Sequence, residues 1–163
     1  MSTPLIFDNV FGEVTPSLIA ELTSYWSSSD MAVAGNMSER AKQVALVARS
    51  AEGAIVGVAS VEKTYHAPFK HDFFLFRASV SRAAGGQLLS SQLLNKTFDL
   101  LNDRYDPNSD TAIGLLASIQ NKHLDRLFSE AVGSRSKMIF IGYNQRGHQM
   151  RIRYFDDARL NPK

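Results

Sequence analysis

Apolar positions recur along this chain with a helical period in three stretches. Thr15 can cap a helix that starts at Pro16, and the residues that follow at helical spacing are Leu18, Ile19, Leu22, Tyr25 and Trp26. The Ser-rich stretch 27–30 ends that helix. We predict further helices over 86–103 and from Asn121 to Gly133, whereas 31–41 reads mostly as loop with a short helical turn at 38–41.

Other stretches are rich in β-branched residues or alternate with a period of two, which predicts strands. An antiparallel hairpin is expected from 42–50 and 54–65, joined by a short loop with Gly53. Pro68 separates it from a strand over 72–80, and the almost wholly apolar run 111–119 suits a central strand buried on both faces. The last pair, 137–143 and 149–155, predicts a C-terminal hairpin.

The order of these elements predicts one α/β (α+β) domain over residues 1–163. A strand, a helix and a strand across 72–119 form a crossover unit, which normally makes its two strands parallel. The hairpins are antiparallel. We therefore expect a mixed, mostly antiparallel sheet with helices on both faces.

Composition narrows the function classes. The chain has 163 residues, no cysteine and 4 histidines, and these histidines do not show the spacing of a metal site. A cysteine nucleophile is excluded, and we expect no metal. No stretch predicts a membrane span or a targeting segment, so we expect a soluble, cytoplasmic protein.

Charge is unevenly spread although the formal net charge is only +2. Residues 135–163 hold 7 of the 18 Lys and Arg residues but 2 of the 16 acidic ones. In the last predicted strand, Met150, Ile152 and Tyr154 alternate with Arg151 and Arg153, which predicts one buried and one basic face. Together with Arg146 and His148 that face could meet an anionic partner, or it could be a solvated strand surface.

The stretch 73–94, FFLFRASVSRAAGGQLLSSQLL, combines an apolar strand, a small-residue turn and an amphipathic helix. Glycines allow the backbone to approach a ligand closely, and the first N–H groups of a helix attract an anion. The stretch therefore suits a phosphate, although Gly85-Gly86 can also serve only as a tight connection.

Two segments resemble motifs of the GNAT superfamily of acyl-CoA N-acyltransferases. Arg82-Ala83-Ala84-Gly85-Gly86-Gln87 resembles the pyrophosphate-binding turn (Arg/Gln)-x-x-Gly-x-(Gly/Ala), with Gln87 at the last position. Asn121 to Phe128 resembles the downstream motif Asn-x-x-Ala-x-x-(Leu/Phe)-Tyr, with Gly133 one residue late. In the order of its helices and strands, nearly the whole chain resembles this family. It implies that the residues that contact acetyl-CoA or another acyl-CoA are Val80, Arg82, Ala83, Ala84, Gly85, Gly86, Gln87, Asn121 and Phe128.

The resemblance also implies the chemistry, transfer of an acyl group to an amine by direct attack in a ternary complex. Phe128 stands where the family has a tyrosine that protonates the departing thiolate, and a phenyl ring cannot donate a proton. Tyr143 or Ser129 could replace it. On the strands that match the family, Glu62 and Asp72 are the candidates for a general base, or they are surface side chains.

These departures leave a second hypothesis open. The chain could be a non-catalytic GNAT-like module that binds a protein, or less favourably a nucleic acid, through its basic C-terminal hairpin. Dimer formation through the C-terminal strands is also compatible with the sequence. The amine acceptor is not predicted, because its pocket would consist of variable loops, here 27–41, 64–72 and 144–149.

Overall fold

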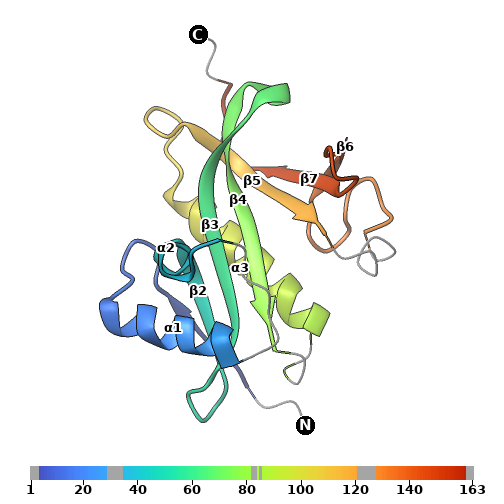
Figure 1. Cartoon of the computed structure of the whole chain (residues 1–163). Coiled ribbons are helices and arrows are strands. Elements are labelled where there is room, and N and C mark those ends of the chain that lie inside the picture. The colour runs from blue at the N-terminus through green and yellow to red at the C-terminus, as the bar shows by residue number, and fades with distance from the viewer. Residues whose placement is uncertain (1–3, 29–34, 82–83, 85, 121–127, 161–163) are drawn as a thin grey trace. The chain divides into compact units, whose positions relative to one another are not determined.

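The computed structural model describes residues 4–28, 35–81, 84, 86–120 and 128–160, and it is a mixed α/β structure (Figure 1). In chain order the elements are β1 (Ile6–Asn9), α1 (Pro16–Ser28), α2 (Met37–Lys42), β2 (Val44–Arg49), β3 (Ile55–His66), the 3-10 helix η1 (Ala67–Phe69), β4 (His71–Val80), α3 (Gly86–Arg104), β5 (Ala112–Ile119), β6 (Ile139–Tyr143) and β7 (Gln149–Tyr154). The predicted strands and the first two long helices are confirmed, α2 is longer than the expected turn, and β1 was not predicted.

The strands form a 7-stranded sheet in the order β1-β2-β3-β4-β5-β7-β6. β4 and β5 are parallel, with Asp72 opposite Ala112 and Leu75 opposite Leu116. The pairs β1–β2, β2–β3, β5–β7 and β6–β7 are antiparallel. The predicted crossover through α3 and the mostly antiparallel sheet are therefore confirmed.

The chain divides into two compact units. Unit 1 contains Met1–Val61 and Arg77–Thr97, and unit 2 contains Glu62–Phe76 and Phe98–Lys163. Three elements, β3, β4 and α3, have residues in both units. The expectation that residues 1–163 form a single domain stays a prediction.

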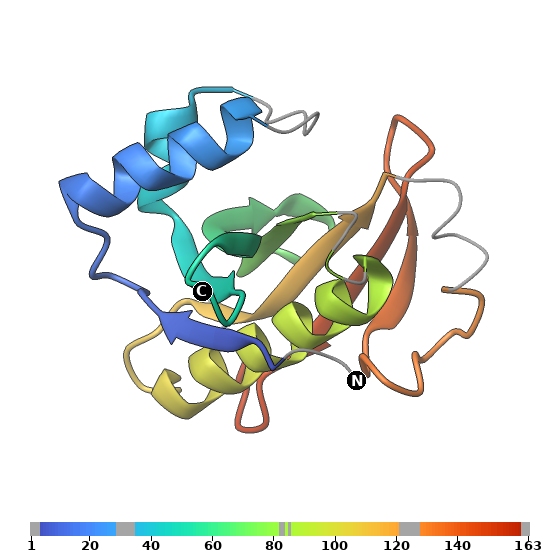
Figure 2. The ribbon, with the colours of Figure 1, turned by 90° about the horizontal axis from the view of Figure 1, so that it is seen from below.

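Unit 1 has helices on both faces of its strands (Figure 2). Val58 of β3 packs in a buried cluster with Leu22 and Trp26 of α1. Its neighbour Gly57 faces the other way, since a Cβ built there would lie 3.1 Å from Leu89 of α3. The alternation of side chains along β3 thus gives the two helix layers separate cores, and the predicted helices on both faces of the sheet are confirmed.

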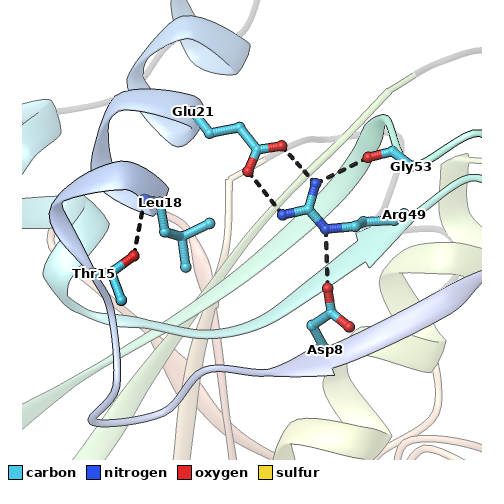
Figure 3. A network of polar contacts seen from close by, with 6 residues as sticks. All are labelled: Asp8, Thr15, Leu18, Glu21, Arg49 and Gly53. Atoms are coloured by element: carbon cyan, nitrogen blue, oxygen red, sulfur yellow. Dashed lines mark hydrogen bonds and ion pairs between the residues drawn. The ribbon is translucent and has the colours of Figure 1, made fainter.

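β1 is fastened to unit 1 by Arg49 at the end of β2 (Figure 3). The guanidinium donates to both carboxylate oxygens of Glu21 at 2.5 and 2.8 Å, to Asp8 at 2.9 Å and to the Gly53 carbonyl at 3.0 Å. One side chain therefore connects β1, α1, β2 and the turn before β3. The four-residue strand β1 lacks a clear period-two pattern of its own, so the sequence pattern did not reveal it.

Unit 2 has its core along β5, between β4 and β7. Ile113 and Leu116 pack there with Phe73 and Ile152. β5 is buried over most of its length, as expected for a central strand. Gly114 permits the close approach of β7, because a Cβ at this position would lie 2.9 Å from the Tyr154 Cα.

The predicted helix from Asn121 to Gly133 is wrong in its described part. Residues 121–127 lie outside the described residues, and from Phe128 to Gly133 the backbone is irregular. Its carbonyls bond to groups distant in sequence: Phe128 and Glu130 accept from Arg151, and Ala131 accepts from the Phe140 amide. These partners take the place of the amides four residues ahead that an α-helix would use.

The predicted basic face of β7 is also wrong. Arg151 is 2% exposed and donates to the Gln149 side chain and to the carbonyls of Phe128, Glu130 and Met138. Tyr154, expected to be buried, is 39% exposed. A long side chain that finds enough acceptors can be buried at a position where polarity alone predicts the surface.

Arg153 is partly withdrawn from solvent as well. Its guanidinium lies 3.5 Å from the centre of the Phe98 ring and donates to the Ser136 carbonyl at 3.3 Å. Of the four groups expected to make the basic face, Arg146 is exposed and His148 is partly buried. The basic surface of the C-terminal hairpin, expected to meet an anionic partner, is therefore reduced.

Candidate functional site

The junction between β4 and α3 is the strongest candidate site in unit 1. β4 ends at Val80, the Ser81 amide donates to the Val56 carbonyl at 2.8 Å, and the Ala84 amide donates to the Ser81 carbonyl at 3.0 Å. α3 begins at Gly86, with Gln87 as its second residue. The predicted site residues Arg82, Ala83 and Gly85 lie outside the described residues.

The start of α3 suits an anion. The helix is 19 residues long and has no acidic residue in its first turn. Amides of a first helical turn have no acceptor within the helix, and the aligned peptide dipoles make this end positive. Because the first turn of α3 has no acidic side chain of its own, these donors suit an anion such as a phosphate group.

Two α1 residues bond to the end of β4, just before this junction. The Tyr25 hydroxyl lies 3.2 Å from the Ser81 Oγ, and the Trp26 indole N–H donates to the Ser79 Oγ at 2.9 Å. Burial raises the pKa of Tyr25, and the hydrogen bond with Ser81 acts in the opposite direction, so the phenol is protonated at neutral pH. In the sequence both aromatic residues read only as apolar helix positions, although the spacing of two between Ser79 and Ser81 is the period of a strand face.

The other predicted contact residues of an acyl-CoA lie in unit 2. Asn121 lies outside the described residues. Phe128 is half-buried, its ring centre lies 5.4 Å from the Arg151 Cζ, and its carbonyl accepts from Arg151 and Gln149 at 2.7 and 3.2 Å. Phe128 thus takes part in the packing of unit 2, which is compatible with its interpretation as a core residue.

The proposed proton-transfer residues occupy separate elements of unit 2. Glu62 lies on β3 and Asp72 on β4, each half-buried. Tyr143 ends β6, is 68% exposed and packs its ring edge-on against Phe140. Ser129 is exposed in the irregular segment. The catalytic roles of these residues stay predictions.

Within the part of the chain that the structure describes, no three His, Asp or Glu side chains gather as a group that could hold a metal ion. None of the described helices has both the length and the apolar character needed to cross a membrane.

Comparison with solved structures identifies the architecture. A GNAT-family N-acetyltransferase (YhbS) from Escherichia coli, in complex with CoA, has a TM-score of 0.61 at 14% identity, covering 96% of this chain and 83% of that one. The phosphinothricin acetyltransferase (Pat) of Sinorhizobium meliloti, in complex with acetyl-CoA, has a TM-score of 0.60 at 16% identity, covering 100% and 94%.

The chain has the GNAT acetyltransferase fold. A bacterial toxin is also similar in structure, with a TM-score of 0.62 at 8% identity, covering 94% of this chain and 92% of that one. No protein-family model matches the sequence, and no curated protein matches it either. The similarity to GNAT-family structures is therefore found in three dimensions, at sequence identities of 13% to 16%.

Proposed function

We propose that this protein is an acyl-CoA-dependent N-acyltransferase that transfers an acetyl group from acetyl-CoA to an amine of a small molecule or a protein. The observation that carries the proposal is the GNAT fold over nearly the whole chain, shared with structures solved with CoA or acetyl-CoA. The start of α3 is the positive end of the helix dipole and has no acidic residue in its first turn, which supports phosphate binding there.

In the proposed reaction the chain supplies binding and orientation. The amides at the start of α3 hold the phosphates of acetyl-CoA, and its thioester is the activated acyl donor. The amine nitrogen attacks the thioester carbonyl, a C–N bond forms, the C–S bond breaks, and the thiolate takes up a proton while the amine loses one. Tyr143 or Ser129 is the proposed proton donor, and Glu62 or Asp72 the proposed base.

The first test is isothermal titration with acetyl-CoA and with free CoA, after mass spectrometry of the purified protein for co-purified ligand. We expect dissociation constants in the range of about 1 µM to 1 mM, as is usual for enzyme substrates. Absence of binding to a folded, ligand-free sample would overturn the proposal.

A matched pair of variants locates the site. Replacing both Gly85 and Gly86 by valine is expected to abolish acetyl-CoA binding, because the added side chains occupy the space next to the backbone amides. Gln92→Val, at an exposed position of the same helix, is the control and should bind normally. Unchanged affinity in the double variant would remove the junction from the site.

Transfer itself can be measured by CoA release with a thiol reagent. The chain contains no cysteine, so every thiol detected comes from the cofactor and the protein gives no background. A panel of amines then identifies the acceptor. Binding of acetyl-CoA without transfer to any amine would favour the alternative, a non-catalytic module with a partner protein.

A further inference from the structure

The end of β4 is held at several points immediately before the junction with α3. Ser81 bonds through its amide to Val56 of β3, through its carbonyl to the Ala84 amide, and through its hydroxyl to Tyr25 of α1. Two residues earlier, Ser79 accepts from Trp26, which is 2% exposed. All of these residues lie within unit 1.

We propose that Tyr25 and Trp26 are positioning residues for the start of α3, where the phosphates of acetyl-CoA are proposed to bind, because they fix Ser79 and Ser81 at the point where the chain leaves β4. The inference rests on the proposed function. Tyr25 and Trp26 need not touch the acyl-CoA. They set the direction in which the backbone leaves β4 toward the start of α3, whose amides are the proposed phosphate donors.

The physical argument is preorganisation. A phosphate is bound well only when several amides point at it together, and ordering a loose loop at the moment of binding reduces affinity. Two hydrogen bonds, one between hydroxyls and one from an indole to a hydroxyl, connect consecutive residues of α1 to Ser81 and Ser79. They reduce the conformational freedom of the backbone there before any ligand binds. Neighbouring α1 residues normally point to different sides, so the pair holds β4 over two positions rather than one.

The experiment compares acetyl-CoA affinity in Tyr25→Phe, Ser81→Ala, their double variant and Ser81→Thr, by isothermal titration. Each of the two single changes removes one side of the same hydrogen bond, and we expect about three- to tenfold weaker binding, as for the loss of one ordinary hydrogen bond. The double variant should be no weaker than either single variant. Ser81→Thr keeps the hydroxyl and should bind like the unaltered protein.

Two controls separate positioning from general stability. Tyr105→Phe removes another tyrosine hydroxyl, one that accepts from the Arg159 amide, and should leave affinity unchanged. S-acetylpantetheine has the thioester arm but no phosphate, so its affinity should not change in Tyr25→Phe, whereas a general loosening of the fold would weaken both ligands.

The outcomes are distinguishable. If the unaltered protein binds no acetyl-CoA, the proposed function is wrong and this inference falls with it. If the unaltered protein binds and Tyr25→Phe and Ser81→Ala bind equally well, the proposed function stands and the positioning role is wrong. Equal weakening for acetyl-CoA and S-acetylpantetheine would also overturn the positioning role.

Discussion

Arg49 of unit 1 and Arg151 of unit 2 each connect several segments of their own unit, but the main acceptors are charged around Arg49 and uncharged around Arg151. Arg49 bonds to the carboxylates of Asp8 and Glu21, whose side chains are 44% and 45% exposed (Figure 3). Arg151 is 2% exposed, and the acceptors of its bonds are the Gln149 side chain and backbone carbonyls.

The difference shows that two arginines on strands can hold a fold by different means. Around Arg49 the carboxylates can return to water when the cation is removed, and their contribution depends on their charge. Around Arg151 the carbonyls of Phe128, Glu130 and Met138 would lose a donor inside the protein. Burial lowers the pKa of Arg151 and the charge of Glu130 acts the other way, but an arginine stays protonated at any physiological pH.

The largest effect is expected for Arg151→Met. It leaves several buried acceptors without a donor, so the free energy of unfolding should fall by about 3 kcal/mol or more, measured by urea unfolding. Arg151→Lys should rescue little of this, because an ammonium cannot reproduce the planar fork that reaches several carbonyls.

The matched control for that change is Arg146→Met, at an exposed position of the turn before β7. Its cost should stay within about 0.5 kcal/mol, as for most surface substitutions. A cost for Arg151→Met as small as that of the control would show that segment 128–138 does not depend on the arginine.

A smaller effect is expected for Arg49→Met. The bonds to Asp8 and Glu21 are partly screened by water, so we expect a loss of roughly 1 kcal/mol in the free energy of unfolding. Chemical denaturation at neutral pH measures it. A loss as large as that of Arg151→Met would contradict the comparison.

The smallest effect is the pH dependence of the Arg49 contribution. The hydrogen bond with Arg49 lowers the pKa of Glu21 from its ordinary value of 4.5. A carboxyl with a lowered pKa in the folded state stabilises the protein above the unfolded pKa and loses this contribution as the pH falls through the folded pKa. The difference between Arg49→Met and the unaltered protein should therefore shrink below pH 4.5.

The corresponding difference for Arg151→Met should shrink less over the same pH range, because the acceptors of its bonds are uncharged amide and carbonyl oxygens and acid removes only the attraction to the Glu130 carboxylate. Urea titrations of both variants from pH 7 to pH 3 test this. Parallel acid profiles for the two substitutions would show that the two networks do not differ in kind.

Most of the fold could be predicted from local patterns. The helical stripe of α3, the apolar run of β5 and the hairpin of β2 and β3 each carry enough periodic residues to indicate their structure. β1 has four residues, and only its pairing with β2 in the structure identifies it as a strand. The segment after Phe128 has helical spacing, but its carbonyls bond to β6 and β7 instead.

The candidate site, too, could be predicted from local sequence patterns only in part. The junction between β4 and α3 was visible as a strand, two glycines and an amphipathic helix, and the same stretch led to the GNAT resemblance. Tyr25 and Ser81 are 56 positions apart, and no local pattern indicates that their hydroxyls meet.

The sequence by itself determined the order of the elements, the parallel crossover around α3 and the glycine junction, since these depend on the period of apolar residues and on the conformational freedom of glycine within one short stretch. Only the tertiary structure decided that Arg151 is buried, that segment 128–133 is irregular, and that α1 holds the end of β4. The physical reason is that the hydrogen-bond partners of a buried polar group are supplied by elements distant in the chain, and these are brought together only by folding.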